Sequence, residues 1–327
     1  MEMDIAKIRE YLGEDWTTVR NLLVSSLDSD IDLLNQTNRS ILSHSGKQLR
    51  PMLALMFSRA CAGKVNDAGI RYAAASELLH NATLLHDDVA DGSELRRGRP
   101  TVMSLMGPSV SVLVGDYWLV KAMELILQDS DTDTVAIRIF SKTLSDLAEG
   151  EMLQLQKAQN GDTDEKDYLR IIYNKTASLF EAACVSAAIS AGACDEHVKA
   201  AKDYAVALGL AFQIKDDILD YSGTESVGKP LGVDILEQKI TMPLLGALAS
   251  VPAEEERIRA LVKDIAGHPE YRDEIVTFVK DNGGLEYAAA RLDEYVAEAV
   301  NALSVLPESF ERRMLEELAH FTAKRTL

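Results

Sequence analysis

Apolar residues recur at intervals of three and four along most of the chain, which is the pattern of helices with one buried face. Residues 167–190 carry one such stripe, and residues 285–303 carry another directly after the break at Gly283-Gly284. Strands would show alternating apolar and polar positions instead, and no convincing run of that kind occurs. The pattern therefore predicts a chain built from helix after helix.

Prolines are distributed in a way that supports this prediction. None occurs between Pro108 and Pro230, a window that a chain of strands and turns would rarely cross without one. The 327 residues suffice for a large core, and no low-complexity stretch or composition shift divides them. We expect one all-α domain over residues 1–327, with ten or more helices.

The charge balance excludes several classes of function. A formal net charge of −18 argues against binding nucleic acid, which requires clustered lysine and arginine. No apolar run approaches the roughly 20 residues of a membrane span, and the charged N-terminus does not resemble a leader peptide. The cysteines Cys61, Cys184 and Cys194 lack the spacing of a metal site, so they read as reduced thiols. We expect a cytoplasmic protein.

A cluster of acidic residues ends one of the apolar helical stretches, in the sequence HDDVADGSELRRGRP. Asp87 and Asp91 are four residues apart, so their side chains share one helix face with Cβ atoms about 5–6 Å apart. Asp88 adds a third carboxylate. After Gly92 the chain continues into a loop with three arginines, which are Arg96, Arg97 and Arg99.

The same D-D-x-x-D arrangement appears a second time. In the sequence FQIKDDILDYSG the acidic residues are Asp216, Asp217 and Asp220, again at the end of an apolar helical stretch. The following loop carries Lys229, and Lys239 lies ten residues beyond it.

A single motif of this kind is usually a solvated helix end, and acids near bases can also form a structural salt-bridge network. However, the helix dipole disfavours negative charge at a helix C-terminus, so several acids there call for cations. Clustered carboxylate oxygens suit Mg²⁺, which commonly binds one or two carboxylates together with substrate phosphates. The nearby arginines and lysines suit the phosphates. Two copies of the arrangement predict a site for magnesium and a diphosphate.

The chain resembles the trans-isoprenyl diphosphate synthases over nearly its whole length. The resemblance rests on blocks that stand in the family's order: GKQLRP, ELLHNATLLHDDVAD, ELRRGRPT, EGEMLQL, NKTASLF, FQIKDDILD and GKPLGVDILEQKITMP. Among family members the first aspartate block is most similar to that of long-chain polyprenyl (octaprenyl-type) synthases. The resemblance implies an all-α bundle around a deep central cavity, usually a homodimer. It also implies addition of isopentenyl diphosphate to an allylic diphosphate, with the product all-trans.

The resemblance also implies roles for individual residues. The family usually binds three Mg²⁺ ions; their main ligands here would be Asp87, Asp91 and Asp216, supported by Asp88, Asp217 and Asp220. The residues that would hold the allylic diphosphate are Arg96, Lys175 and Lys229. Those for isopentenyl diphosphate are Lys47, Arg50, His80 and Arg97. The residues that would line the reacting region, beside Lys175, are Thr176, Gln213 and Lys239.

Product length depends on the helix that precedes the first motif. Ala82 and Thr83 lie five and four residues before Asp87, respectively, at a level where short-chain family members commonly carry aromatic side chains. Small residues there predict a long product, although they would serve close helix packing equally well. Two turns further back, Ala75 and Ser76 are small too. The tunnel floor has three candidates that the sequence does not rank, namely Phe140, Leu144 and Leu147.

Three other functions fit parts of the pattern. A synthase that stops at farnesyl or geranylgeranyl diphosphate would carry the same motifs. A class I terpene cyclase generally has an Asn/Ser/Glu pattern in place of the second motif. A non-catalytic partner subunit would have lost some of the acids and bases, and none is missing here.

For assembly we expect a homodimer that packs through the apolar helix containing Val112, Leu113 and Leu119.

Overall fold

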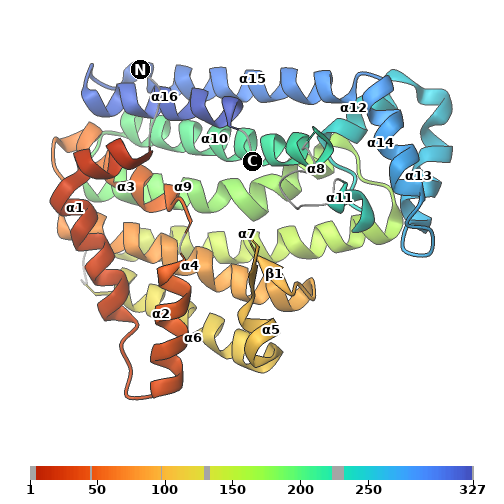
Figure 1. Ribbon diagram of the computed structural model, residues 1–327. Coiled ribbons are helices and arrows are strands. Elements are labelled where there is room, and N and C mark those ends of the chain that lie inside the picture. Colours follow the sequence, from red (N-terminus) through yellow and green to blue (C-terminus); the bar gives the residue numbers. More distant parts are fainter. Residues whose placement is uncertain (1–4, 45, 97, 129–132, 223–231, 326–327) are drawn as a thin grey trace. The chain divides into compact units, whose positions relative to one another are not determined.

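The structure is a computed structural model, and it describes residues 5–44, 46–96, 98–128, 133–222 and 232–325. These residues form more than ten helices and one two-stranded hairpin, which confirms the predicted all-α class (Figure 1). Within the described part of the chain, no helix is long and apolar enough to span a membrane.

The chain divides into two compact units. Unit 1 comprises Met1–Ser141, Ala182–Ala201 and Val305–Met314, and unit 2 comprises Lys142–Glu181, Lys202–Ser304 and Leu315–Leu327. The expectation of one domain over residues 1–327 stays a prediction.

The first unit is built around a long helix that is buried over most of its middle part. Its own elements are α1 (Ile5–Ser26), α2 (Asp32–Ser43), α3 (Leu49–Ala62), α4 (Asp67–Ala90), β1 (Leu95–Arg96), β2 (Arg99–Pro100), α5 (Val102–Met106) and α6 (Pro108–Ile126). Helix α4 packs along α6 and also contacts α1 and α3 (Figure 1). Small residues on α4, such as Ala74, Ala75 and Ser76, are completely buried and allow these helices to lie close together.

Four α-helices contribute residues to both units, and they are α7 (Asp133–Asn160), α9 (Ser178–Ser190), α10 (Asp195–Ser222) and α16 (Phe310–Lys324). The remaining elements are α8 (Glu165–Ile172), the π-helical turn η1 (Tyr173–Ala177), α11 (Val233–Leu236), α12 (Met242–Ser250), η3 (Pro252–Glu254), α13 (Glu255–Asp264), α14 (Tyr271–Asp281), α15 (Gly284–Ala302) and η4 (Leu303–Val305). In unit 2, α12 packs against both α14 and α15.

Helix α4 has a well-defined start and end. Asn66 caps the N-terminus of α4 by accepting a 2.8 Å hydrogen bond from the Gly69 N–H, which satisfies one of the first turn's unpaired donors. The same helix ends at Ala90, and Asp91 is its C-cap. Both aspartate motifs therefore lie in the last turns of long helices, the first on α4 and the second on α10.

Candidate active site

The first aspartate motif, on α4 in unit 1, has a buried middle residue. The Asp88 side chain is 5% exposed, and its Oδ1 accepts a 2.7 Å hydrogen bond from Arg96 Nε. Arg96 lies in β1, which pairs with β2 in a short hairpin directly after the helix. The Ser93 N–H donates to the Asp88 carbonyl at 2.9 Å and turns the chain toward this hairpin. Asp88 is thus neutralised by a cation from its own loop.

The outer residues of the first motif are more accessible. Asp87 is partly buried, whereas Asp91 is exposed at the helix C-cap, where its N–H donates to the Asp87 carbonyl at 2.8 Å. Both carboxylates lie near the helix end, where the dipole favours a bound cation. Arg97, predicted to bind isopentenyl diphosphate, lies outside the described residues.

The other predicted diphosphate ligands of unit 1 surround the start of α3 and the middle of α4. Lys47 is exposed, and Arg50 is partly buried in the first turn of α3. Between them Gln48 has a φ of 54°, in the left-handed region that a side chain with a Cβ rarely adopts. His80 on α4 is partly buried.

In the second aspartate motif, on α10 in unit 2, neutral groups hold the middle carboxylate. Asp217 is 2% exposed. Its Oδ2 accepts a 2.5 Å hydrogen bond from the Tyr168 hydroxyl, and its Oδ1 accepts a 3.0 Å bond from Gln213 Nε2. The Thr176 hydroxyl donates to Gln213 Oε1 at 3.0 Å, which fixes the orientation of that amide. Burial, and then the nearby Asp234, raise the pKa of Asp217 well above its ordinary value.

The outer residues of this motif have different partners. Asp220 accepts bonds from the backbone N–H groups of Val233 and Asp234, at 3.1 and 3.2 Å, and so ties α10 to the start of α11. Asp216 Oδ1 lies 2.8 Å from Nη2 of Arg325, and the Asp216 side chain is 43% exposed. The sequence interpretation missed Arg325, because nothing in the local sequence relates it to a residue over a hundred positions earlier.

Lys175 and Thr176 lie on the π-helical turn η1, a kind of helix irregularity that is often found at functional sites. Two glycines allow neighbouring helices to approach this turn closely. A Cβ on Gly209 of α10 would lie 2.5 Å from Ala177 Cα, and one on Gly150 of α7 would lie 2.6 Å from Asn174 Cβ. Any larger residue would displace the turn that carries Lys175.

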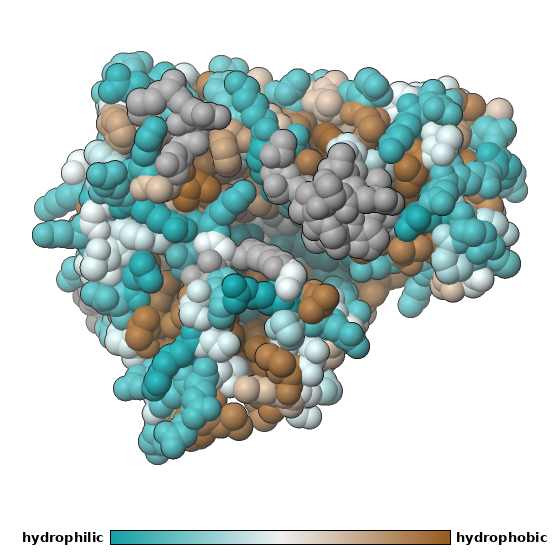
Figure 2. All heavy atoms as spheres, in the orientation of Figure 1, coloured by the Kyte–Doolittle hydropathy of each residue, from teal (hydrophilic) through white to brown (hydrophobic). Residues whose placement is uncertain are grey.

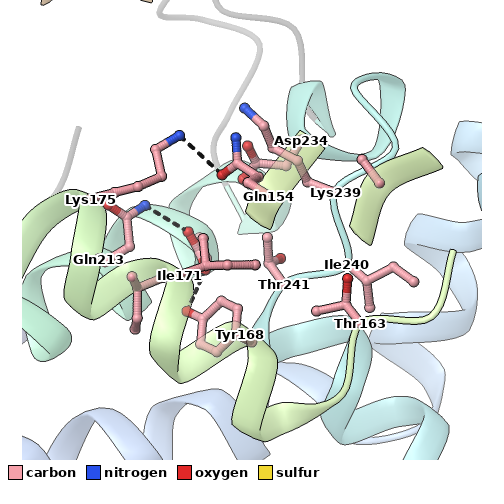
Figure 3. A pocket seen from close by; sticks show the side chains of 13 residues that line it. Gln154, Thr163, Tyr168, Ile171, Lys175, Gln213, Asp234, Lys239, Ile240 and Thr241 are labelled. Atoms are coloured by element: carbon pink, nitrogen blue, oxygen red, sulfur yellow. Dashed lines mark hydrogen bonds between the residues drawn. The ribbon is translucent and has the colours of Figure 1, made fainter. Parts of the chain in front are cut away.

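A pocket of about 120 Å³ in unit 2 brings several of the predicted residues together (Figure 3). It is lined by Gln154, Ala158, Thr163, Tyr168, Ile171, Ile172, Lys175, Gln213, Asp217, Asp234, Lys239, Ile240 and Thr241. Of the predicted site residues, Lys175, Gln213, Asp217 and Lys239 line it, and Thr176 is bonded to Gln213. Lys229 lies outside the described residues.

Acidic and amide groups hold both lysines of this pocket. Lys175 Nζ lies 2.5 Å from Glu151 Oε2 and donates to Gln154 Oε1 at 3.1 Å (Figure 3). Lys239 forms an ion pair with Glu237. Glu151 and Gln154 come from the EGEMLQL block of α7, to which the sequence interpretation gave no function. Their spacing of three on one helix face was the available signal.

Asp234 is a further lining residue that sequence reasoning missed. Burial, with the nearby Asp220, raises its pKa to about 6, although Lys239 and Lys175 act in the opposite direction. Together with the second motif it makes this part of unit 2 rich in closely spaced carboxylates. Among the residues that the structure describes, no three His, Cys, Asp or Glu side chains are already arranged to hold a metal ion.

Comparisons with known proteins identify the family of the chain. A sequence model of the polyprenyl synthetase family matches residues 31–279. The octaprenyl diphosphate synthase of Escherichia coli (strain K12) is 38% identical over 325 residues, covering 99% of both chains. An all-trans-nonaprenyl-diphosphate synthase (geranyl-diphosphate specific) of Rhodobacter capsulatus is 36% identical over 316 residues, 96% of both chains.

Solved structures give the same result. The crystal structure of a decaprenyl diphosphate synthase from Rhodobacter capsulatus matches with a TM-score of 0.90 and 36% identity, covering 98% of this chain and 99% of that one. The fold, the two aspartate motifs and these similarities confirm the resemblance seen in the sequence: the chain belongs to the polyprenyl synthetase family and is a trans-prenyltransferase.

Proposed function

We propose that this enzyme adds isopentenyl diphosphate head-to-tail to an allylic diphosphate and repeats the addition to make a long all-trans polyprenyl diphosphate. The observation that carries this proposal is the pocket of unit 2, where Lys175 and Lys239 line the same cavity as the buried Asp217. Cations, carboxylates and an apolar wall formed by Ile171, Ile172 and Ile240 suit a substrate with a charged head and a hydrocarbon tail.

The carboxylates fit magnesium. Asp87 and Asp91 near the end of α4, and Asp216 near the end of α10, offer hard oxygen donors that are not fully buried. We propose these three as ligands, with Asp88, Asp217 and Asp220 holding the motifs in shape. Mg²⁺ usually completes its coordination with substrate phosphates and water, so an arranged cage of three protein ligands is not required. Bound there, it would supply electrophilic stabilisation of charge on the departing diphosphate.

The basic side chains of the site fall into two groups, one for each diphosphate substrate. We propose that Arg96, Lys175 and Lys229 bind the allylic diphosphate, and that Lys47, Arg50, His80 and Arg97 bind isopentenyl diphosphate. Lys175 is held in place by Glu151 and Gln154 before a substrate arrives. This pre-positioning lowers the entropy cost of binding an anion.

The reaction then needs no nucleophilic side chain. The allylic carbon–oxygen bond breaks, the double bond of isopentenyl diphosphate forms the new carbon–carbon bond, and a proton leaves to regenerate an allylic product. The released pyrophosphate can accept that proton. We propose that the bonded pair Thr176–Gln213 and Lys239 line the reacting region, because Gln213 and Lys239 face the same pocket.

The long product is supported by the relatives named for octaprenyl, nonaprenyl and decaprenyl products, each at least 36% identical. In the structure Ala82 is completely buried and Thr83 is partly buried, with its hydroxyl bonded to the His80 carbonyl at 2.9 Å. The roles of these two residues in chain length, and of Phe140, Leu144 and Leu147 as a tunnel floor, are proposals.

The exposed apolar residues of unit 1 support a homodimer. Leu105 on α5 and Val112, Leu113 and Val120 on α6 are all exposed, whereas Leu119 is partly buried. Figure 2 shows hydrophobic surface among polar groups near α5 and α6. We propose that a second copy covers this surface. A monomer by light scattering at micromolar concentration would contradict the homodimer.

A cytoplasmic location stays a prediction.

The test is incubation of the purified protein with labelled isopentenyl diphosphate, farnesyl diphosphate and Mg²⁺. We expect label to enter an allylic product, with no incorporation when EDTA is added or the primer is left out. Incorporation that persists in EDTA would contradict the metal dependence. Absence of incorporation with any allylic primer would contradict the function.

A further inference from the structure

The turn that carries Lys47 is held in an unfavourable backbone conformation. Gln48 follows Lys47 with a φ of 54°, and it caps the N-terminus of α3 in the left-handed conformation. A residue with a Cβ is strained there, and such conformations persist only when the surrounding structure holds them. Some contact next to Gln48 must therefore stabilise the turn.

Arg9 of α1 makes that contact. Its Nη2 donates to the Lys47 carbonyl at 2.8 Å and approaches the Gly46 carbonyl at 3.4 Å. The guanidinium lies 5.3 Å from the centroid of the Trp16 ring, which is almost fully buried on the same helix. Trp16 thus orients Arg9 through a cation–π contact, and Arg9 fixes the two peptide groups immediately before the strained residue.

We propose that Arg9 is a positioning residue for isopentenyl diphosphate. By holding the Gly46 and Lys47 carbonyls it presents the exposed Lys47 ammonium, and the adjacent start of α3 with Arg50, to that substrate. This inference rests on the proposed function, which assigns Lys47 and Arg50 to isopentenyl diphosphate. Arg9 lies before residue 31, where the match to the family begins.

A second arginine provides a matched control for the docking of α1. Arg59 of α3 donates to the Tyr11 and Leu12 carbonyls of α1, at 3.0 and 2.9 Å, and pairs with Asp15 at 2.6 Å. Like Arg9 it links α1 to the region of α3, but among the described residues its side chain contacts α1 and not the Lys47 turn. Arg59→Met therefore weakens helix docking without loosening that turn.

The experiment compares steady-state kinetics of Arg9→Met, Arg9→Lys, Arg59→Met and Lys47→Ala. We expect Arg9→Met to raise the KM for isopentenyl diphosphate about tenfold, the effect of losing one charged hydrogen bond, with kcat and the allylic KM within about twofold. Arg9→Lys keeps a cationic donor and should restore most of the affinity. Arg59→Met should lower the melting temperature but leave this KM unchanged.

A double variant tests the strained turn directly. Glycine adopts a φ of 54° without strain. Gln48→Gly should therefore reduce the effect of Arg9→Met on the KM for isopentenyl diphosphate.

Three outcomes would overturn the inference. An equal KM increase in Arg59→Met would show that Arg9 acts only through docking of α1. An unchanged KM in Arg9→Met, with an increase in Lys47→Ala, would leave the substrate assignment standing and remove Arg9 from it. An unchanged KM in Lys47→Ala would remove the assignment itself and the inference with it.

Discussion

Asp88 and Asp217 hold the same place in two copies of one motif, and both are buried, with 4% and 2% of the whole residue exposed. Asp88 is paired with the Arg96 guanidinium from the loop that follows its own helix. Asp217 is held by the Tyr168 hydroxyl and the Gln213 amide, which carry no charge. An identical pattern of carboxylates therefore sits in two different electrostatic environments.

The difference indicates how the negative charge of each motif is compensated. In unit 1 the protein supplies a cation for the buried carboxylate, so that motif is compensated before substrate binds. In unit 2, burial raises the pKa of both Asp217 and Asp234. The nearby Asp234 raises the pKa of Asp217 further, and the nearby Asp220 raises that of Asp234. Arg325 already pairs with the outer Asp216. We infer that the buried part of the second motif depends more on cations that arrive with the substrates.

The largest effect should come from removing a proposed metal ligand in either unit. Asp87→Ala and Asp216→Ala should each lower kcat by at least about a hundredfold, more than is typical for a residue that only supports a ligand. Circular dichroism should show an unchanged fold, because each change also relieves like-charge repulsion. Glu308→Ala, at a side chain that is 82% exposed, is the control. Activity within tenfold of the parent in either variant would remove that motif from the metal site.

The cations of the two units should separate the two substrates. Arg50→Ala in unit 1 should mainly raise the KM for isopentenyl diphosphate, and Lys175→Ala in unit 2 should mainly raise that for the allylic substrate. Loss of a charged hydrogen bond corresponds to an increase in KM of about ten- to a hundredfold. If both variants affected both substrates equally, the assignment of the two diphosphates would be wrong.

The partners of the two buried carboxylates should differ in their contribution to stability. Arg96→Met leaves the buried Asp88 carboxylate without its cation. It should lower the free energy of unfolding by about 2 kcal/mol, allowing for the partial exposure of Arg96. Tyr168→Phe removes a neutral hydrogen-bond donor. It should lower the free energy of unfolding by about 1 kcal/mol, since Asp217 keeps its hydrogen bond from Gln213. Urea unfolding with EDTA present measures both. A larger loss in Tyr168→Phe would reverse the comparison.

A smaller effect should appear in the pH dependence of stability. The pKa of Asp234 rises from 3.8 to about 6 on folding. A raised carboxyl pKa contributes stability that is present below about pH 4 and is lost as the pH rises through about 6. Asp234→Asn removes that loss, so its melting temperature in EDTA should exceed the parent's at pH 8 and converge with it toward pH 4. A constant difference across that range would show that Asp234 does not titrate as its surroundings indicate.

The sequence predicted the helical class and the chemistry of the two motifs, because both depend on local spacing. The period of three and four identified the helices, and the acidic residues at two helix ends required cations. The contacts of Tyr168, Asp234 and Arg325 could not be predicted in this way. Each joins residues far apart in the chain, such as Tyr168 and Asp217, and only the packing of α8 against α10 brings that pair together.

The π-helical turn was also beyond sequence reasoning. Residues 173–177 continue the apolar spacing of an ordinary helix, and nothing local predicts the extra residue in the turn. The close approach of Gly150 and Gly209 is visible only in three dimensions. Site residues identified by type were therefore accessible from the sequence, whereas the long-range packing that positions them was not.

The length of the product tests the central claim most directly. The parent enzyme should convert farnesyl and isopentenyl diphosphates into products longer than geranylgeranyl diphosphate. Ala82→Phe or Thr83→Phe should shift the product toward geranylgeranyl diphosphate from the farnesyl primer, or toward farnesyl diphosphate from a shorter allylic primer, while the first additions keep substantial rate. If these residues serve packing alone, the variants should instead lose roughly 1–3 kcal/mol of stability and keep the parental product. Chain-length analysis that finds only short products from the parent, or an unchanged length in both variants, would contradict the account.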